Sequence, residues 1–210
     1  FIALAMDQIV SQAAKMYYMT GGQVSVPLLI HTPLGAGRSS AAQHSQSLHA
    51  WLCHIPGVKV VLPSTPYDAK GLLKTAVKDA KPVIFYDDKM MYSLKGAVPN
   101  DDYSIPFGVA DIKRTGTDVT VVATSSMVQV ALKAADTLAK EGISVEVVDP
   151  RTLKPLDLDT IISSVKKTSR AVVIDEGYFS YGVTGEIASQ ISDLAFDYLD
   201  APVKRIGAED

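Results

Sequence analysis

The sequence lacks the features from which disulfides, cysteine metal sites and membrane helices are built. Cys53 is the only cysteine in 210 residues, so neither a disulfide within the chain nor a site with several cysteine ligands is possible. A lone cysteine fits a reducing compartment, and we expect Cys53 to be a small core residue. No apolar run approaches the roughly 18 residues that span a bilayer, so no membrane segment is expected.

Blocks of like charge and the common catalytic motifs are also missing. The 20 basic and 23 acidic residues are interspersed and give a formal net charge of -3, which is not the pattern of a protein that binds nucleic acid or a membrane surface. The sequence has no G-x-G-x-x-G or G-x-x-x-x-G-K-[ST] phosphate loop, no G-x-S-x-G elbow and no H-E-x-x-H motif. We therefore expect no nucleotide bound by this chain alone, and neither a serine hydrolase nor a zinc enzyme.

The sequence does have enough apolar residues for one large domain or two small ones, since 47% of it is hydrophobic. In the first half, apolar spacing with glycine and proline punctuation predicts alternating helices and strands. Ser64 or Thr65 is expected to cap a helix that begins at Pro66. The expected elements are a helix over 5–17 that ends at Gly21-Gly22, a strand over 26–31, a helix over 47–54, a strand over 58–62, a helix over 66–77 and a strand over 82–86.

The periodicity lapses between Asp87 and Gly108, where prolines and aspartates are common, and we place a domain boundary there. Beyond it, strands alternate with helices of about 10 to 15 residues, which implies right-handed crossovers and a parallel sheet. The expected elements are strands over 119–123, 144–148 and 171–174 and helices over 127–140, 156–166 and 184–194. The predicted fold class is α/β, with two tandem three-layer α/β/α domains and mostly parallel sheets.

A loop of glycines and small residues, 35–46, lies between a predicted strand and a predicted helix, and it contains His44. Ligands of open α/β sheets bind at the carboxyl ends of strands, and an imidazole transfers protons near neutral pH. His44 is therefore the leading catalytic candidate, with a hydrogen-bonded loop histidine as the alternative. We expect His49 and His54 to serve packing or capping. His31 ends a strand and is compatible with either role.

Two acidic motifs also follow predicted strands. Asp175-Glu176-Gly177 comes after the strand over 171–174, at a place where a ligand could bind. Carboxylates are common in turns, so we favour capping or a subunit contact for this motif. We expect Asp149-Pro150-Arg151 to order an interface rather than a substrate.

Several segments together resemble the beta subunit of thiamine-diphosphate-dependent 2-oxo acid dehydrogenases. These segments are Met6-Asp-Gln-Ile9, Tyr18-Met19 before Gly21-Gly22, Ala42-Gln-His-Ser-Gln46, Pro56-Gly-Val-Lys-Val60, Pro66-Tyr-Asp-Ala-Lys-Gly-Leu72 and Asp149-Pro-Arg-Thr152. They lie in the order and spacing of that family and cover nearly the whole chain. The resemblance implies a transketolase-like pyrimidine-binding domain over 1–95 with its amino-terminal part missing, a linker over 96–106 and a transketolase carboxyl-terminal domain over 107–210.

Within the family, Gln43 before His44 is similar to the pyruvate and acetoin branch. The segments 95–99 and 103–107 are similar to acetoin dehydrogenase in particular. The resemblance implies attack of the thiazolium carbanion on a carbonyl carbon and transfer of the acetyl unit to a lipoyl group. The cofactor itself performs the difficult chemical step. His44 matches the histidine that assists reductive acylation of the lipoyl group. Phe1 aligns with the aromatic residue that packs on the aminopyrimidine.

The resemblance also implies cofactors and partners. Thiamine diphosphate with Mg²⁺ would be shared with an alpha subunit, which carries the diphosphate signature, in an α2β2 enzyme that binds a dihydrolipoyl acyltransferase core. The family's activating glutamate lies upstream of Phe1, so we expect the sequence to be part of a longer protein. His31-Thr-Pro-Leu34 replaces the family's basic, glycine-rich stretch. A K⁺ site of backbone carbonyls maps onto Leu28, Ala76, Val77, Asp79 and Lys81.

The sequence thus predicts a beta subunit of a pyruvate or acetoin dehydrogenase, active only with its alpha partner. We expect it in the bacterial cytoplasm, with the mitochondrial matrix as the alternative, and bound to neither nucleic acid nor membrane. One competing hypothesis is a transketolase or deoxyxylulose-phosphate synthase relative, which needs basic residues near the loop, where only Arg38 is available. Another is a non-catalytic assembly subunit. The sequence does not choose between pyruvate and acetoin.

Overall fold

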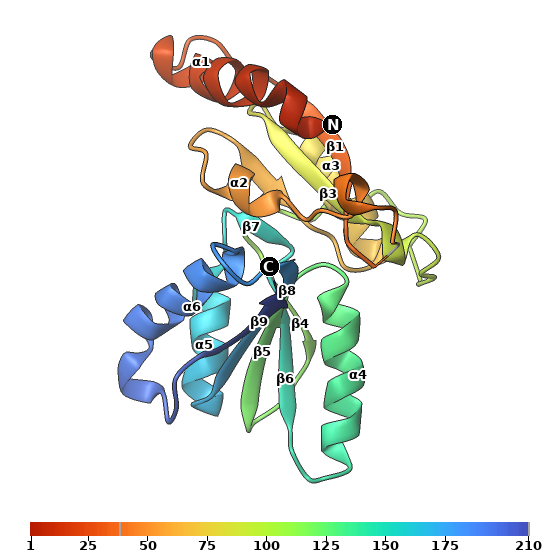
Figure 1. The fold of residues 1–210 in the computed structure, drawn as a ribbon, viewed down its shortest axis with the longest axis vertical. Coiled ribbons are helices and arrows are strands. Elements are labelled where there is room, and N and C mark those ends of the chain that lie inside the picture. The colour runs from red at the N-terminus through yellow and green to blue at the C-terminus, as the bar shows by residue number, and fades with distance from the viewer. Residues whose placement is uncertain (38, 210) are drawn as a thin grey trace.

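The computed structural model, which describes residues 1–37 and 39–209, consists of two α/β units that lie one above the other (Figure 1). The first half of the chain forms the upper unit of the view and the second half forms the lower one. Each unit is built on one sheet, of four strands in the first and five in the second. The predicted fold class, tandem α/β layers with mostly parallel sheets, is confirmed.

The first sheet has the strand order β1-β3-β2-β7, in which β1, β3 and β2 are parallel and β7 is antiparallel to β2. Its strand β7 comes from the second half of the chain, so the two units share a sheet rather than only a linker. The elements of this half are η1 (Ile2–Ala5), the π-helical η2 (Gln8–Ala13), α1 (Ala14–Met19), β1 (Leu29–Leu34), η3 (Ala42–His44), α2 (His49–Cys53), β2 (Lys59–Val61), α3 (Pro66–Lys78), β3 (Val83–Asp88) and η4 (Lys89–Met91).

The second sheet has the order β4-β6-β5-β8-β9, with only β4 antiparallel to its neighbour. Helix α4 covers one face, and α5 and α6 cover the other, which gives three layers (Figure 1). The elements are β4 (Asp111–Arg114), β5 (Val119–Ala123), α4 (Met127–Ala139), β6 (Val145–Asp149), β7 (Thr152–Lys154), α5 (Leu158–Thr168), β8 (Ala171–Tyr178), α6 (Val183–Leu194), η5 (Phe196–Tyr198) and β9 (Lys204–Ala208).

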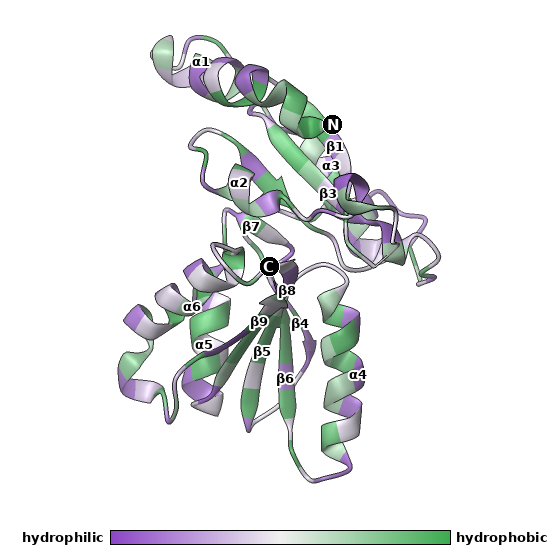
Figure 2. Cartoon of the chain, in the orientation of Figure 1, coloured by the Kyte–Doolittle hydropathy of each residue, from purple (hydrophilic) through white to green (hydrophobic). Residues whose placement is uncertain are grey.

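Hydrophobic side chains fill both faces of each sheet. In the second unit, Val173 packs with Ile161 and Ile191 beneath α5 and α6, and Val147 packs with Val128 beneath α4. Figure 2 shows this apolar character along β3, β5 and β6. Full burial of each such side chain contributes about 1.5–3 kcal/mol. Of the helices in the described part of the chain, none is both long and apolar enough to cross a membrane.

Two expected elements differ from the structure in instructive ways. The helix expected over 5–17 is a succession of η1, η2 and α1, which still buries Ile9 and Ala14. The strand expected over 26–31 is β1, which starts at Leu29 and runs through Pro33 to Leu34. Proline has no backbone N–H to donate to a neighbouring strand. Because β1 is an edge strand of the described sheet, Pro33 is tolerated there without loss of a hydrogen bond between strands.

The motif Asp175-Glu176-Gly177 does not form the turn expected from sequence. It lies inside β8, which continues to Tyr178, and its pairing with β9 shifts register between Ile174 and Tyr178. The bulge allows the strand to continue past its last regular pair, so the carboxylates project from a strand rather than from a turn.

A buried ionic cluster joins the two units. Asp68, at the start of α3, accepts from Lys113 Nζ at 2.6 Å and from Arg151 Nε at 2.8 Å, both from the second unit. Ser64 donates to the buried carboxylate of Asp149, and burial raises the pKa of Asp149 to about 6. Asp111 binds Arg151 as well, at 3.0 Å. Asp149-Pro150-Arg151 therefore orders an interface within the chain, as expected.

Candidate active site

The glycine-containing loop connects β1 to α2, at the carboxyl ends of β1 and β3. It begins at Gly35, whose φ is +109°. A Cβ atom there would lie 3.0 Å from Glu176 Oε1 and 3.1 Å from Asp88 Oδ1. Only glycine suits both this conformation and this close approach. Arg38 lies outside the described residues.

His44 ends the short helical turn η3 within this loop and is exposed. Its ring centroid lies 5.8 Å from that of Phe1, with the two planes at 45°. Its backbone carbonyl accepts a hydrogen bond from Lys89 Nζ. The structure thus brings together the two residues to which the family resemblance assigns catalysis and cofactor packing.

Phe1 and His44 both line a pocket of about 590 Å³. Its other lining residues are Ile2, Ala3, Thr32, Pro33, Ser40, Gln43, Gln46, Leu48, Trp51, Tyr86 and Lys89. Phe1 is 94% exposed as a residue, so its ring is accessible to a flat ring that enters the pocket. The imidazole beside it can deliver a proton to a group in the same pocket.

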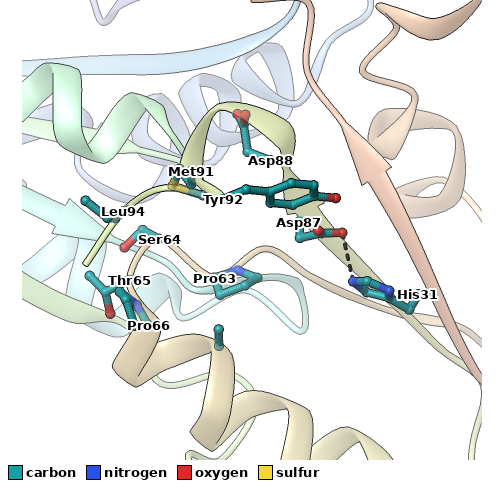
Figure 3. A pocket seen from close by; sticks show the side chains of 11 residues that line it. His31, Pro63, Ser64, Thr65, Pro66, Asp87, Asp88, Met91, Tyr92 and Leu94 are labelled. Carbon is teal, nitrogen blue, oxygen red and sulfur yellow. Dashed lines mark ion pairs between the residues drawn. The ribbon is translucent and has the colours of Figure 1, made fainter. Parts of the chain in front are cut away.

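His31 does not belong to this pocket. It lies in β1 and its Nε2 is 2.8 Å from Asp87 Oδ1, an ion pair when the imidazole is protonated. Both residues line a separate pocket of about 250 Å³ beside the start of α3 (Figure 3). In Figure 3 Asp87 points toward His31, and Asp88 points away from it. The structure thus separates His31 from His44.

His49 is buried and pairs with a residue of the other unit. Its Nε2 lies 2.9 Å from Asp175 Oδ2, and Thr124 donates to the other carboxylate oxygen. Gly177 N donates to Oδ2 at 2.8 Å. Burial opposes ionisation of Asp175, but His49 and these two donors together hold its pKa below the usual range. The expected role of His49 was packing or capping, because no local pattern in the sequence reveals a partner so distant along the chain.

Cys53 and His54, which were also considered from sequence, lie at the end of α2. His54 is exposed and follows the last residue of the helix. Cys53 is partly buried, and burial raises the pKa of its thiol to about 12. A thiol that stays protonated is a poor nucleophile, which suits a core residue.

Glu176 is the residue near the loop that sequence analysis undervalued. Its Oε1 accepts from Ser47 Oγ at 2.9 Å, and its Oε2 accepts from Ser126 Oγ at 3.2 Å. Burial and the neighbouring Asp88 carboxylate raise the pKa of Glu176 to about 7. The side chain therefore takes up a proton close to physiological pH, beside the loop that carries His44.

The residues mapped to a potassium site surround the end of α3 and the start of β3. The carbonyl of Leu28 accepts from Val83 N at 2.8 Å, and that of Ala76 accepts from Asp79 N at 3.3 Å. Asp79 Oδ1 accepts from Lys81 N at 2.9 Å. Each carbonyl oxygen keeps a second lone pair. The site stays a prediction at Leu28, Ala76, Val77, Asp79 and Lys81.

Comparison with known proteins assigns the family. Residues 1–95 match the model of the transketolase pyrimidine binding domain, and residues 108–210 match that of the transketolase C-terminal domain. The chain is 51% identical over 208 residues to the acetoin:2,6-dichlorophenolindophenol oxidoreductase subunit beta of Bacillus subtilis (strain 168). It is 49% identical over 211 residues to the pyruvate dehydrogenase E1 component subunit beta of Rhizobium meliloti (strain 1021). The chain is built from the two transketolase domains, and the relatives it resembles are beta subunits.

The chain spans only part of the length of these relatives. The two matches cover 99% and 100% of it but 61% and 46% of the relatives' lengths. Among solved structures, one named split gene transketolase, inactive beta4 tetramer, superposes with a TM-score of 0.70 at 25% identity, over 96% of this chain and 65% of that one. The family expected from sequence is confirmed.

Proposed function

We propose that this chain is part of the beta subunit of a thiamine-diphosphate-dependent enzyme that oxidises pyruvate or acetoin and passes the acetyl unit to a lipoyl group. The proposal rests mainly on one observation. Phe1 and His44 line the same pocket, and their ring centroids are 5.8 Å apart. The names of the relatives support it, since they are subunits of pyruvate dehydrogenase and of an acetoin oxidoreductase.

The pocket fits one end of thiamine diphosphate. The exposed ring of Phe1 suits the flat aminopyrimidine, and Trp51 and Tyr86 add aromatic surface. Within 1–37 and 39–209, no group of three His, Cys, Asp or Glu side chains is placed to hold a metal ion. We assign Mg²⁺ and the diphosphate to an alpha subunit, as the family resemblance implies. The bound cofactor would supply the nucleophilic carbon.

The chain's own residues orient groups and move a proton. His44, at the exposed side of the pocket, holds a proton for the lipoyl sulfur that becomes a thiol as the other sulfur is acylated. Lys89 anchors the His44 backbone through its carbonyl, which leaves the imidazole free. Phe1 holds the aminopyrimidine by ring contact.

The names of the relatives support a proposal for the partners and the place of action. We infer an alpha subunit in an α2β2 enzyme and a dihydrolipoyl acyltransferase core as partners, and a domain division at 1–95, 96–106 and 107–210. The bacterial relatives favour the bacterial cytoplasm, and a rice relative named as mitochondrial keeps the matrix as the alternative.

The competing hypothesis of a sugar-phosphate enzyme has less support. It requires basic side chains at the loop, and the described cation there, Lys89, is bound to the carbonyl of His44. Apart from His44 and Lys89, the lining side chains of the pocket are aromatic, aliphatic, hydroxyl or amide groups. A non-catalytic role remains the other alternative, because the solved tetramer that this chain resembles is named as inactive.

Calorimetric titration of thiamine diphosphate with Mg²⁺ tests the proposal. We expect binding by the full-length subunit only after it is mixed with an alpha subunit, followed by turnover of pyruvate or acetoin in that mixture. Tight binding by the beta subunit alone would contradict the shared site. Binding without turnover of either substrate would favour the non-catalytic alternative.

A further inference from the structure

The side chain of Glu176 touches both ends of the loop that carries His44. At the start of the loop, a Cβ atom on Gly35 would lie 3.0 Å from Glu176 Oε1, so the backbone itself packs on the carboxyl group. At the end of the loop, Ser47 Oγ donates to the same Oε1 at 2.9 Å. Glu176 belongs to β8 in the second unit, so a residue of one unit closes the base of a loop that belongs to the other.

The opposite side of the loop rests on η4. Lys89 donates to the carbonyl of His44, and the side chain of Met90 lies 3.0 Å from where a Cβ of Gly37 would be. Asp88 fixes this short helix, because its Oδ1 accepts from Met90 N at 2.7 Å. The described part of the loop is thus held by η4 on one side and by Glu176 at its base.

Asp88 and Glu176 are the two acids at this base. Asp88 is fully buried, and its Oδ2 has no hydrogen-bond partner among the described residues. A proton carried by the Glu176 carboxyl would give Asp88 that partner and remove the repulsion between two buried carboxylates. The remaining contacts to Glu176 are the hydroxyls of Ser47 and Ser126, and the adjacent Asp175 is already paired with His49.

We propose that Glu176, paired with Asp88, is a positioning residue for His44, holding both ends of loop 35–47 so that the imidazole stays at the pocket beside Phe1. The inference rests on the proposed function, in which His44 serves acyl transfer to the lipoyl group. It assigns to Asp175-Glu176-Gly177 a role that is neither capping nor direct ligand binding.

Three variants of the full-length subunit, assembled with its alpha partner, test this proposal. Glu176→Ala removes both loop contacts. Glu176→Gln keeps an oxygen for Ser47 and gains an N–H that can donate to Asp88. Ser47→Ala removes only the contact at the end of the loop. The matched control is Glu141→Ala, at an exposed turn after α4.

Hydrogen exchange of the loop peptide is the first measurement. We expect Glu176→Ala to speed exchange over 35–47 by about fivefold, as for the loss of a hydrogen bond, and Ser47→Ala to speed it less. Glu176→Gln and Glu141→Ala should stay within about twofold of wild type. Peptides of α4 serve as an internal check that each variant is folded. Unchanged exchange in Glu176→Ala would overturn the proposal.

The second measurement separates the steps of the reaction. Glu176→Ala should slow acetylation of a lipoyl domain by about tenfold or more while oxidation with an artificial electron acceptor is retained, and Glu176→Gln should restore the rate. Equal loss of both steps would overturn a positioning role. If wild-type enzyme acetylates no lipoyl domain but Glu176→Ala still loosens the loop, the proposed function fails and the loop contact stands.

Discussion

The ring centroid of Phe1 lies 5.8 Å from that of His44, although His44 belongs to η3 and Phe1 precedes the first helical turn of the chain. This relationship places an aromatic face and a proton donor on the same pocket. It is the geometry that a flat cofactor ring and an acyl acceptor would need, and it motivates the first and last predictions below.

Phe1→Ala in the full-length subunit should weaken binding of thiamine diphosphate to the assembled enzyme by about two- to tenfold, because a ring contact of this kind contributes roughly 0.5–1.5 kcal/mol. Calorimetric titration measures the change in dissociation constant. Phe196→Ala, at an exposed phenylalanine of η5, is the matched control and should leave affinity unchanged. Equal affinity in wild type and Phe1→Ala would remove Phe1 from the cofactor site.

The ionic cluster between the units predicts a pH dependence of stability through Asp149. Its folded pKa of about 6 lies above the ordinary value, so its contribution to stability is complete below about pH 4 and is lost as the pH rises through 6. Asp149→Asn stays neutral throughout. As the pH is raised from 4 to 7, the free energy of unfolding of the variant should therefore increase relative to that of wild type, by up to about 3 kcal/mol.

Denaturant unfolding of both proteins across that range tests the Asp149 prediction. A constant difference in the free energy of unfolding at every pH would contradict it. Thr137→Ala, at an exposed position of α4 that carries no titratable group, is the control and should differ from wild type by the same amount at every pH.

A cation bound to the carbonyls of Leu28, Ala76 and Val77, with Asp79 and Lys81, should make thermal stability depend on potassium. A ligand that binds only the folded state raises the melting temperature, and at about 100 times its dissociation constant it adds roughly 2.7 kcal/mol. We expect a higher melting temperature in potassium chloride than in choline chloride at the same ionic strength. Equal melting temperatures in the two salts would remove the site.

Much of the fold could be predicted from periodicity and punctuation. The strand expected over 119–123 coincides with β5, and the helix expected after Pro66 begins there, with Thr65 as its cap. The short strands β4, β7 and β9 were missed, because each is an edge strand whose sequence has no apolar run. Edge strands are defined by their neighbours rather than by their own pattern.

The candidate site was predictable only in part. The glycine loop marks His44 locally, but nothing local connects it with Glu176. Ser47 and its partner Glu176 are 129 positions apart in the sequence, and His49 and its partner Asp175 are 126 positions apart. Both contacts depend on how the second unit packs on the first. The bulge in β8 that carries the two acids depends on pairing with β9, which the sequence pattern does not show.

The most direct test of the account is the rate of acetyl transfer to a lipoyl domain by the reconstituted enzyme with His44→Ala. The account predicts a loss of about 10²- to 10⁴-fold, as for a missing acid-base group, with oxidation by an artificial acceptor retained. His54→Ala, an exposed histidine at the end of α2, should transfer at the wild-type rate. An unchanged rate in His44→Ala would contradict the account and make His44 a residue of the loop only.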